Sequence, residues 1–119
     1  MSVKYRKYKQ SLELNNLFNE LNERIRQIIQ HMHISNVHVM LIQGTRSKWV
    51  HDRTIGEYKI LFQPAADKGP AQHAGTAIII HNDLLRLTFY RKAFLSENRA
   101  MFVRIKSKFI NIVFLTAYA

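Results

Sequence analysis

The sequence contains no cysteine, and only 4 glycines and 2 prolines among its 119 residues. Without cysteine the chain can form no disulfide bond, no zinc–thiolate site and no thiol nucleophile. The scarcity of glycine and proline, together with 47% hydrophobic residues, excludes a disordered or fibrous chain and predicts a packed core. At this length we expect one domain at most.

Long apolar runs are also missing. The longest, which include residues 77–80 and 112–115, fall far short of the ~20 residues that a membrane-spanning helix needs. The N-terminus is charged where a secretory signal peptide would turn apolar. We therefore expect no membrane partner and no secretion, but an intracellular protein, nuclear or cytoplasmic.

Acidic residues are few: Asp and Glu number 8 against 18 Lys and Arg, which gives a net charge of +10. Such an excess predicts a polyanionic partner, nucleic acid first, with a basic but inert surface as the alternative. Residues 1–10 form a basic arm interleaved with tyrosines, which suits contact with phosphates and bases, although a short basic terminus is more often a solvated tail. The candidate phosphate-binding residues of the arm are Lys4, Arg6, Lys7 and Lys9.

From Leu14 to Met32, apolar residues recur at the i, i+3, i+4, i+7 spacing that marks one face of a helix. We expect this amphipathic helix to dock on a sheet. His31 and His33 lie near its end, but residues two apart on a helix point to different sides. A polar helix end is therefore favoured over a zinc site there.

The remainder of the chain is typical of strands. The short apolar run 37–42 predicts a buried strand, and the segment 64–75, which holds both prolines, predicts a loop. In the segment 99–106, apolar residues alternate with a basic outer face that includes Arg104 and Lys106, and Ser107-Lys108 is short enough for a hairpin. Strands are predicted at 37–42, 58–62, 76–81, 99–106 and 109–117, with a sixth candidate at 85–90. The fold class is therefore α/β or layered α+β, with one main helix and five to six strands.

Three segments, in order, resemble the endonuclease/exonuclease/phosphatase superfamily, and within it the endonuclease domain of non-LTR retrotransposons, a relative of the apurinic endonucleases. Val39–Arg46 (VMLIQGTR) is similar to a family strand that ends in Leu-Gln-Glu-Thr and a basic residue. Gly75–Ile80 (GTAIII) resembles the family's Gly-Gly-x-Ala-Ile-Leu-Ile strand. Asn98-Arg99, followed by Ile110–Ala119 (INIVFLTAYA), resembles Gly-Arg and a later strand that ends in Asn-x-Tyr-Ala-Pro.

This resemblance covers residues 11–119 and implies about the first half of a two-sheet α/β sandwich that cleaves DNA phosphodiesters with Mg²⁺. Gly44 stands where the family has its principal magnesium-ligating Glu, so we expect this chain to bind no Mg²⁺ there. Tyr118 matches a tyrosine beside the scissile phosphate, Arg46 matches the basic residue after the first motif, and Glu13 could supply a carboxylate near the family's first-strand motif.

The family's remaining catalytic pairs, Asp-x-Asn and Asp-His, would follow Ala119. We therefore expect a truncated, inactive endonuclease domain that self-associates or pairs with a missing C-terminal half. The residues alone leave open a small basic nucleic-acid-binding or interaction module without catalysis. Its binding surface would consist of the arm and the basic residues Arg104, Lys106 and Lys108.

Overall fold

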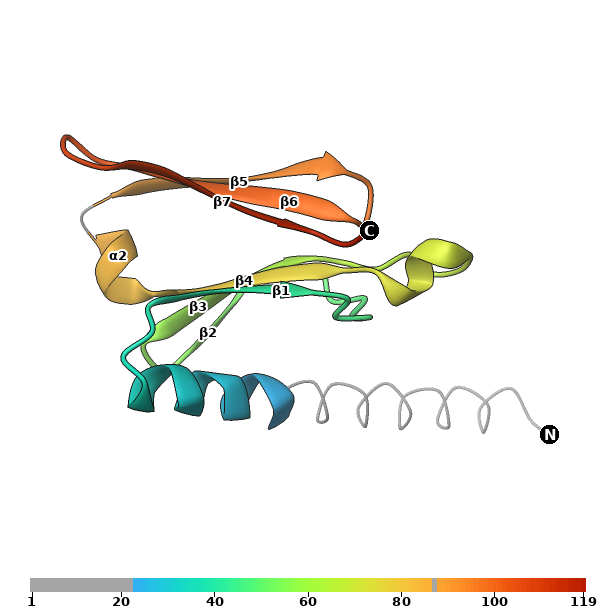
Figure 1. The fold of residues 1–119 in the computed structure, drawn as a ribbon, viewed down its shortest axis with the longest axis horizontal. Helices are drawn as coiled ribbons and strands as arrows, with labels where there is room; N and C mark the ends of the chain where they lie inside the picture. Colours follow the sequence, from blue (N-terminus) through green and yellow to red (C-terminus); the bar gives the residue numbers. More distant parts are fainter. Residues whose placement is uncertain (1–22, 87) are drawn as a thin grey trace, which may run out of the picture. The chain divides into compact units, whose positions relative to one another are not determined.

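A computed structural model describes residues 23–86 and 88–119, so the basic arm and Glu13 lie outside the described range. The described chain is α+β, with residues 23–34 helical and seven strands in two antiparallel sheets (Figure 1). The chain divides into two units, Met1–Ser35 and Asn36–Ala119. No helix within the described ranges is long and apolar enough to cross a membrane.

In the first unit, the predicted helix is confirmed over its described part, residues 23–34. Its last turn is closed by a hydrogen bond from the Ser35 backbone N–H to the carbonyl of His31, at 2.9 Å. Ile25 and Met32, which the helical spacing places on one face, are buried, whereas His31 and His33 are exposed. The described residues thus reproduce the predicted apolar face.

The first sheet of the second unit has the strand order β1-β4-β3-β2, and every neighbouring pair is antiparallel. β3 and β4 lie in the middle and are almost wholly buried, in agreement with their mostly apolar sequences, YKILFQ and TAIIIH. The predicted strands at 58–62 and 76–81 and the loop 64–75 are confirmed, the loop containing a short 3-10 helix, η1. The elements are β1 (Val39–Gln43), β2 (Arg53–Ile55), β3 (Tyr58–Gln63), η1 (Pro70–His73) and β4 (Thr76–His81).

Two expectations for this sheet are wrong. The run 37–42 was expected to be buried, but β1 is an edge strand with one neighbour, so its side chains are half-buried or exposed. β2 was missed, which raises the strand count to seven over the described residues. Three residues, two of them polar, are too few to show an alternating pattern.

The second sheet has the order β5-β6-β7, again antiparallel. The alternation of β6 is confirmed, and the hairpin to β7 is closed by a hydrogen bond from Ser107 N–H to the Ile110 carbonyl at 2.7 Å. The sixth candidate strand is displaced, because a short helix, α2, occupies part of the segment 85–90 and β5 begins after it. The elements are α2 (Asn82–Arg86), β5 (Phe89–Ser96), β6 (Ala100–Lys106) and β7 (Asn111–Ala117).

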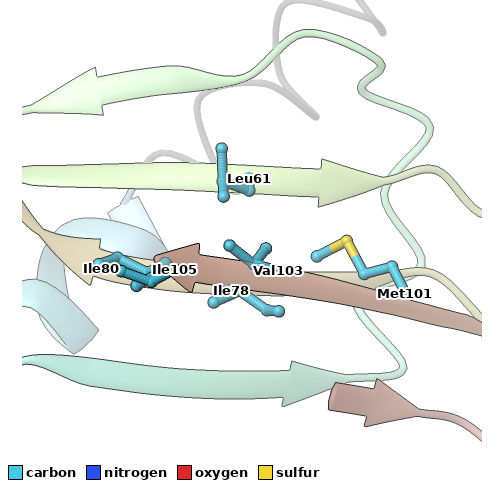
Figure 2. Close-up of a cluster of buried hydrophobic side chains, with 6 residues drawn as sticks. All are labelled: Leu61, Ile78, Ile80, Met101, Val103 and Ile105. Carbon is cyan, nitrogen blue, oxygen red and sulfur yellow. The ribbon is translucent and has the colours of Figure 1, made fainter. Parts of the chain in front are cut away.

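The two sheets pack face to face as layers, with α2 linking them at one end (Figure 1). The core between them is made of side chains from β3, β4 and β6 that are all fully or almost fully buried (Figure 2). β-branched and long apolar side chains on facing strands fill such an interior at high density. The core residues are Leu61, Ile78, Ile80, Met101, Val103 and Ile105.

Candidate functional site

The site that the sequence motifs point to lies where β1 and β7 end. Gly44 follows β1 and Tyr118 follows β7, and a Cβ atom placed on Gly44 would lie 3.1 Å from Cε2 and 3.3 Å from Cδ2 of the Tyr118 ring. Two residues before each of these positions, the Thr116 hydroxyl of β7 donates to the Ile42 carbonyl of β1 at 3.1 Å, although the two residues are 74 apart in sequence. The ends of the two strands are therefore in direct contact.

Backbone hydrogen bonds join four segments at this end of the sandwich. Thr45 N–H donates to the Gly75 carbonyl at 3.1 Å, and Gly75 N–H donates to the Asn98 carbonyl at 2.8 Å. Tyr118 N–H donates to the Arg99 carbonyl at 2.7 Å. All three sequence motifs thus meet in one place, which we call the Gly44–Tyr118 end: residues 43–46, 74–76, 98–99 and 117–118.

Buried amide and hydroxyl groups hold this end in shape. Gln63 Nε2 donates to the Ser96 carbonyl at 2.6 Å, and the Thr76 hydroxyl donates to Gln63 Oε1 at 3.0 Å. Asn98 Nδ2 donates to the Pro64 carbonyl at 2.8 Å. Gln63 and Thr76 are almost fully buried, so each depends on these partners. Sequence reasoning missed both residues, because a polar residue at the end of an apolar strand gives no sign of what it will contact.

Two arginines belong to the Gly44–Tyr118 end. Arg46 is exposed, lies two residues after Gly44 and has a left-handed backbone conformation, with φ at 56°. The Arg99 guanidinium carbon lies 5.9 Å from the centroid of the Tyr118 ring, within the range of a cation–π contact. Arg46 was predicted as a phosphate-binding residue, whereas Arg99 was noted only as part of a motif. The nearest carboxylate along the chain from Arg99 is Glu97, which is exposed in the same turn.

The residues at this end do not fit the Mg²⁺ site that the resemblance implies. Gly44 has no side-chain oxygen, and the Tyr118 ring occupies the space into which a side chain on residue 44 would extend. Among the residues that the structure describes, no group of three or more His, Cys, Asp or Glu side chains could hold a metal ion. No chemical step through a metal is therefore derived for this chain.

Of the other predicted phosphate-binding residues, the two that the structure describes, Arg104 and Lys106, lie away from this end. Arg104 and Lys106 are exposed on β6, on the side that faces away from the core, and Arg104 Nε donates to Asn111 Oδ1 at 2.9 Å. β6 begins at Ala100, which pairs with Ala117, the residue before Tyr118. Lys106 is the last residue of β6 and therefore lies at the opposite end of the strand. The remaining predicted phosphate-binding residues, which belong to the arm, lie outside the described residues: Lys4, Arg6, Lys7 and Lys9. Glu13, the predicted carboxylate, lies outside them as well.

A second polar cluster, not anticipated from the sequence, surrounds His81 at the far end of β4. Its Nε2 lies 3.3 Å from Glu57 Oε2, and its Nδ1 accepts from the Asp83 N–H at 3.0 Å. The rings of His38 and Tyr58 lie 5.0 and 4.9 Å from its own, centroid to centroid. These contacts fix the start of α2, so a structural role accounts for them.

Comparisons of this chain with models of protein families, with curated proteins and with solved structures found no match in any of the three. What the chain does is therefore inferred from its own residues and their contacts.

Proposed function

We propose that this chain forms part of a sandwich of the endonuclease/exonuclease/phosphatase type, similar to the endonuclease domain of non-LTR retrotransposons, and that its Gly44–Tyr118 end contacts the DNA backbone without cleaving it. The contact between Gly44 and Tyr118 carries this proposal. The two positions resemble the metal-ligand and phosphate-adjacent positions of one active site, and they lie 3.1 Å apart, from the Cβ position of Gly44 to Tyr118 Cε2. Two segments matched by sequence alone therefore meet in space.

The side chains at this end suit a phosphodiester. Arg99 is half-buried beside the Tyr118 ring, and Arg46 is exposed two residues after Gly44, so two arginines belong to the same end of the sandwich as one aromatic side chain. Guanidinium groups bind phosphate oxygens through paired N–H donors, and such backbone contacts give DNA binding that does not depend on sequence. An aromatic ring at the same place offers a hydroxyl donor and a surface for stacking.

Glycine at position 44 supports binding without cleavage. Hydrolysis of a phosphodiester needs a group that activates water and a positive centre that stabilises the developing charge, and the resembling family obtains the second from Mg²⁺. The side chain that would hold this ion is missing at Gly44, and the Tyr118 ring lies 3.1 Å from the Cβ position there. The arginines and Tyr118 can bind and orient a phosphate.

A second candidate function is nucleic-acid binding by the outer face of β6. Arg104 and Lys106 alternate with buried apolar residues and point away from the core. Together they form an exposed basic strip. Such a strip would bind phosphates with no relation to the Gly44–Tyr118 end. The two candidates place the contact on different surfaces, so they can be separated by substitution.

Fluorescence anisotropy with a labelled DNA duplex, measured over a range of salt concentrations, distinguishes the two surfaces. Three double variants each remove two positive charges: Arg46→Ala/Arg99→Ala at the proposed site, Arg104→Ala/Lys106→Ala on the outer face, and Arg24→Ala/Arg26→Ala, at two exposed positions of the helix, as a control. We expect the first variant to lose affinity most and to lower the salt slope of log K by about 1.8, since each phosphate contact contributes ~0.9.

A loss confined to Arg104→Ala/Lys106→Ala would support the second candidate and contradict the first. Equal losses in all three variants would mean that only the net charge matters, and would contradict both.

A further inference from the structure

The core of the sandwich is open along one side, where β1 and β7 lie next to each other. Leu41 of β1 and Ile112 of β7 face inward, since each is paired in register with a core residue, Ile78 and Ile105 respectively. Yet Leu41 is 42% exposed and Ile112 is 44% exposed. Within the described residues, therefore, apolar side chains that point into the sandwich are left in contact with solvent.

β1 and β7 are also the ends of their sheets, so each presents a row of backbone N–H and C=O groups that no described strand pairs with. Sheet edges of this kind are normally protected by charge, by proline, by a bulge or by short length. The other two edges have such protection. β5 carries Arg91 and Lys92 and an irregularity between Phe94 and Ser96, and β2 is three residues long and begins with Arg53.

β1 and β7 have none of these protective features. Neither strand contains a charged residue or a proline, and β7 pairs with β6 without a break over seven residues. The contrast between protected and unprotected edges in one molecule indicates that the β1–β7 side is covered by another strand. On its inner face that strand must be largely apolar, since it covers Leu41 and Ile112.

We propose that the covering strand is β7 of a second copy of this chain, added antiparallel across a two-fold axis at Phe114. Antiparallel pairing of a strand with itself is self-complementary, as a two-fold interface requires. In this register Phe114 pairs with its own copy, Ile112 with Thr116 on the inner face, and Val113 with Leu115 on the outer face. The inner pairs cover the open core.

The lack of charge on β7 favours this occupant over the chain's own basic arm, whose four Lys and Arg residues would bring charges onto an apolar edge. No charged side chain lies on β7, so pairing two copies places no like charges opposite each other, although each chain carries a net charge of +10. The dimer sheet then runs β5-β6-β7-β7-β6-β5. Its two remaining edges are the β5 strands, which are the protected ones. This inference does not depend on the proposed DNA contact.

Sedimentation equilibrium of the full chain over a wide concentration range tests the proposal. We expect a species of about 28 kDa, twice the protomer mass of 14.0 kDa. Val113→Lys places a charge on the edge strand and should weaken self-association by about tenfold or more. Leu95→Lys is the matched control, because Leu95 is 58% exposed and Val113 is 55% exposed, and Leu95 lies on β5 of the same sheet. This control variant should leave the dimer intact.

Hydrogen exchange on the unmodified chain gives a readout that does not depend on how the variants fold. The backbone N–H groups of residues 111–117 that point away from β6 should become protected as the protein concentration rises. A wild-type chain that stays monomeric, with these amides unprotected at every concentration, would overturn the proposal and leave the edge to a different polypeptide. A dimer that Leu95→Lys dissociates and Val113→Lys does not would overturn it too.

Discussion

Gly75 stands at a point where no side chain fits, and it shows how single residues shape the Gly44–Tyr118 end. Its φ is +86°, and a Cβ atom there would lie 2.5 Å from Thr45 Oγ1 and 3.2 Å from the Ala65 nitrogen. Gly44 also has a positive φ, +63°, and a Cβ atom there would lie 3.1 Å from Cε2 of the Tyr118 ring. Both glycines therefore meet a backbone requirement and a space requirement at once.

At this scale we predict that Gly75→Ala lowers the free energy of unfolding by about 2–4 kcal/mol, the sum of a left-handed backbone cost and a steric clash. Gly56→Ala is the control. Gly56 has φ +57° but nothing within 4 Å of its Cβ position, so only the backbone cost of about 1 kcal/mol remains. Urea unfolding of the two variants measures the difference, and equal losses would show that the contact with Thr45 is not tight.

At the scale of elements, position within the sheet decides how much each strand is buried. β3 and β4 have neighbours on both sides and lose nearly all contact with solvent, whereas β1 and β7, with one neighbour each, keep apolar side chains exposed. Ile105 and Ile112 illustrate this: they pair in register on the inner face, yet Ile105 is 2% exposed and Ile112 is 44% exposed.

This pair provides a prediction with a built-in control. Ile105→Ala should cost about 2–5 kcal/mol of unfolding free energy, because it leaves a cavity in the core. Ile112→Ala should cost less than half as much in dilute solution, since water already reaches the side chain. Chemical denaturation at low protein concentration tests this, and similar costs for both would mean that the β7 side is not open.

The elements also show what the sequence could and could not predict. Apolar alternation predicted β6, and continuous apolar runs predicted β3 and β4, because side-chain period reflects burial directly. That β1 is an edge strand was not predictable, since an apolar run carries no information about how many neighbours it will have. β2 and α2 are too short for any period to emerge, and local contacts such as the Asp83 N–H to His81 bond decide their form.

At the scale of the whole molecule, the basic residues discussed above that the structure describes lie on separate surfaces. Arg99 lies beside Tyr118 and Arg46 follows β1 at the same end, while Arg104 and Lys106 lie on the outer face of β6. The sequence motifs predicted that Gly44, Arg46 and Tyr118 belong to one site. Arg99 and Thr76 lie within the motifs but were given no role, and Gln63 lies outside them; their contacts with Tyr118 and with each other come from long-range packing.

The central claim is that the Gly44–Tyr118 end binds DNA without cleaving it, and a plasmid assay with Mg²⁺ tests it most directly. Purified chain is incubated with supercoiled plasmid, and the same samples are analysed for mobility shift and for nicked product. We expect a mobility shift that Arg46→Ala/Arg99→Ala weakens, and no nicked circles. Nicking by the wild-type chain that Tyr118→Phe abolishes would contradict the claim.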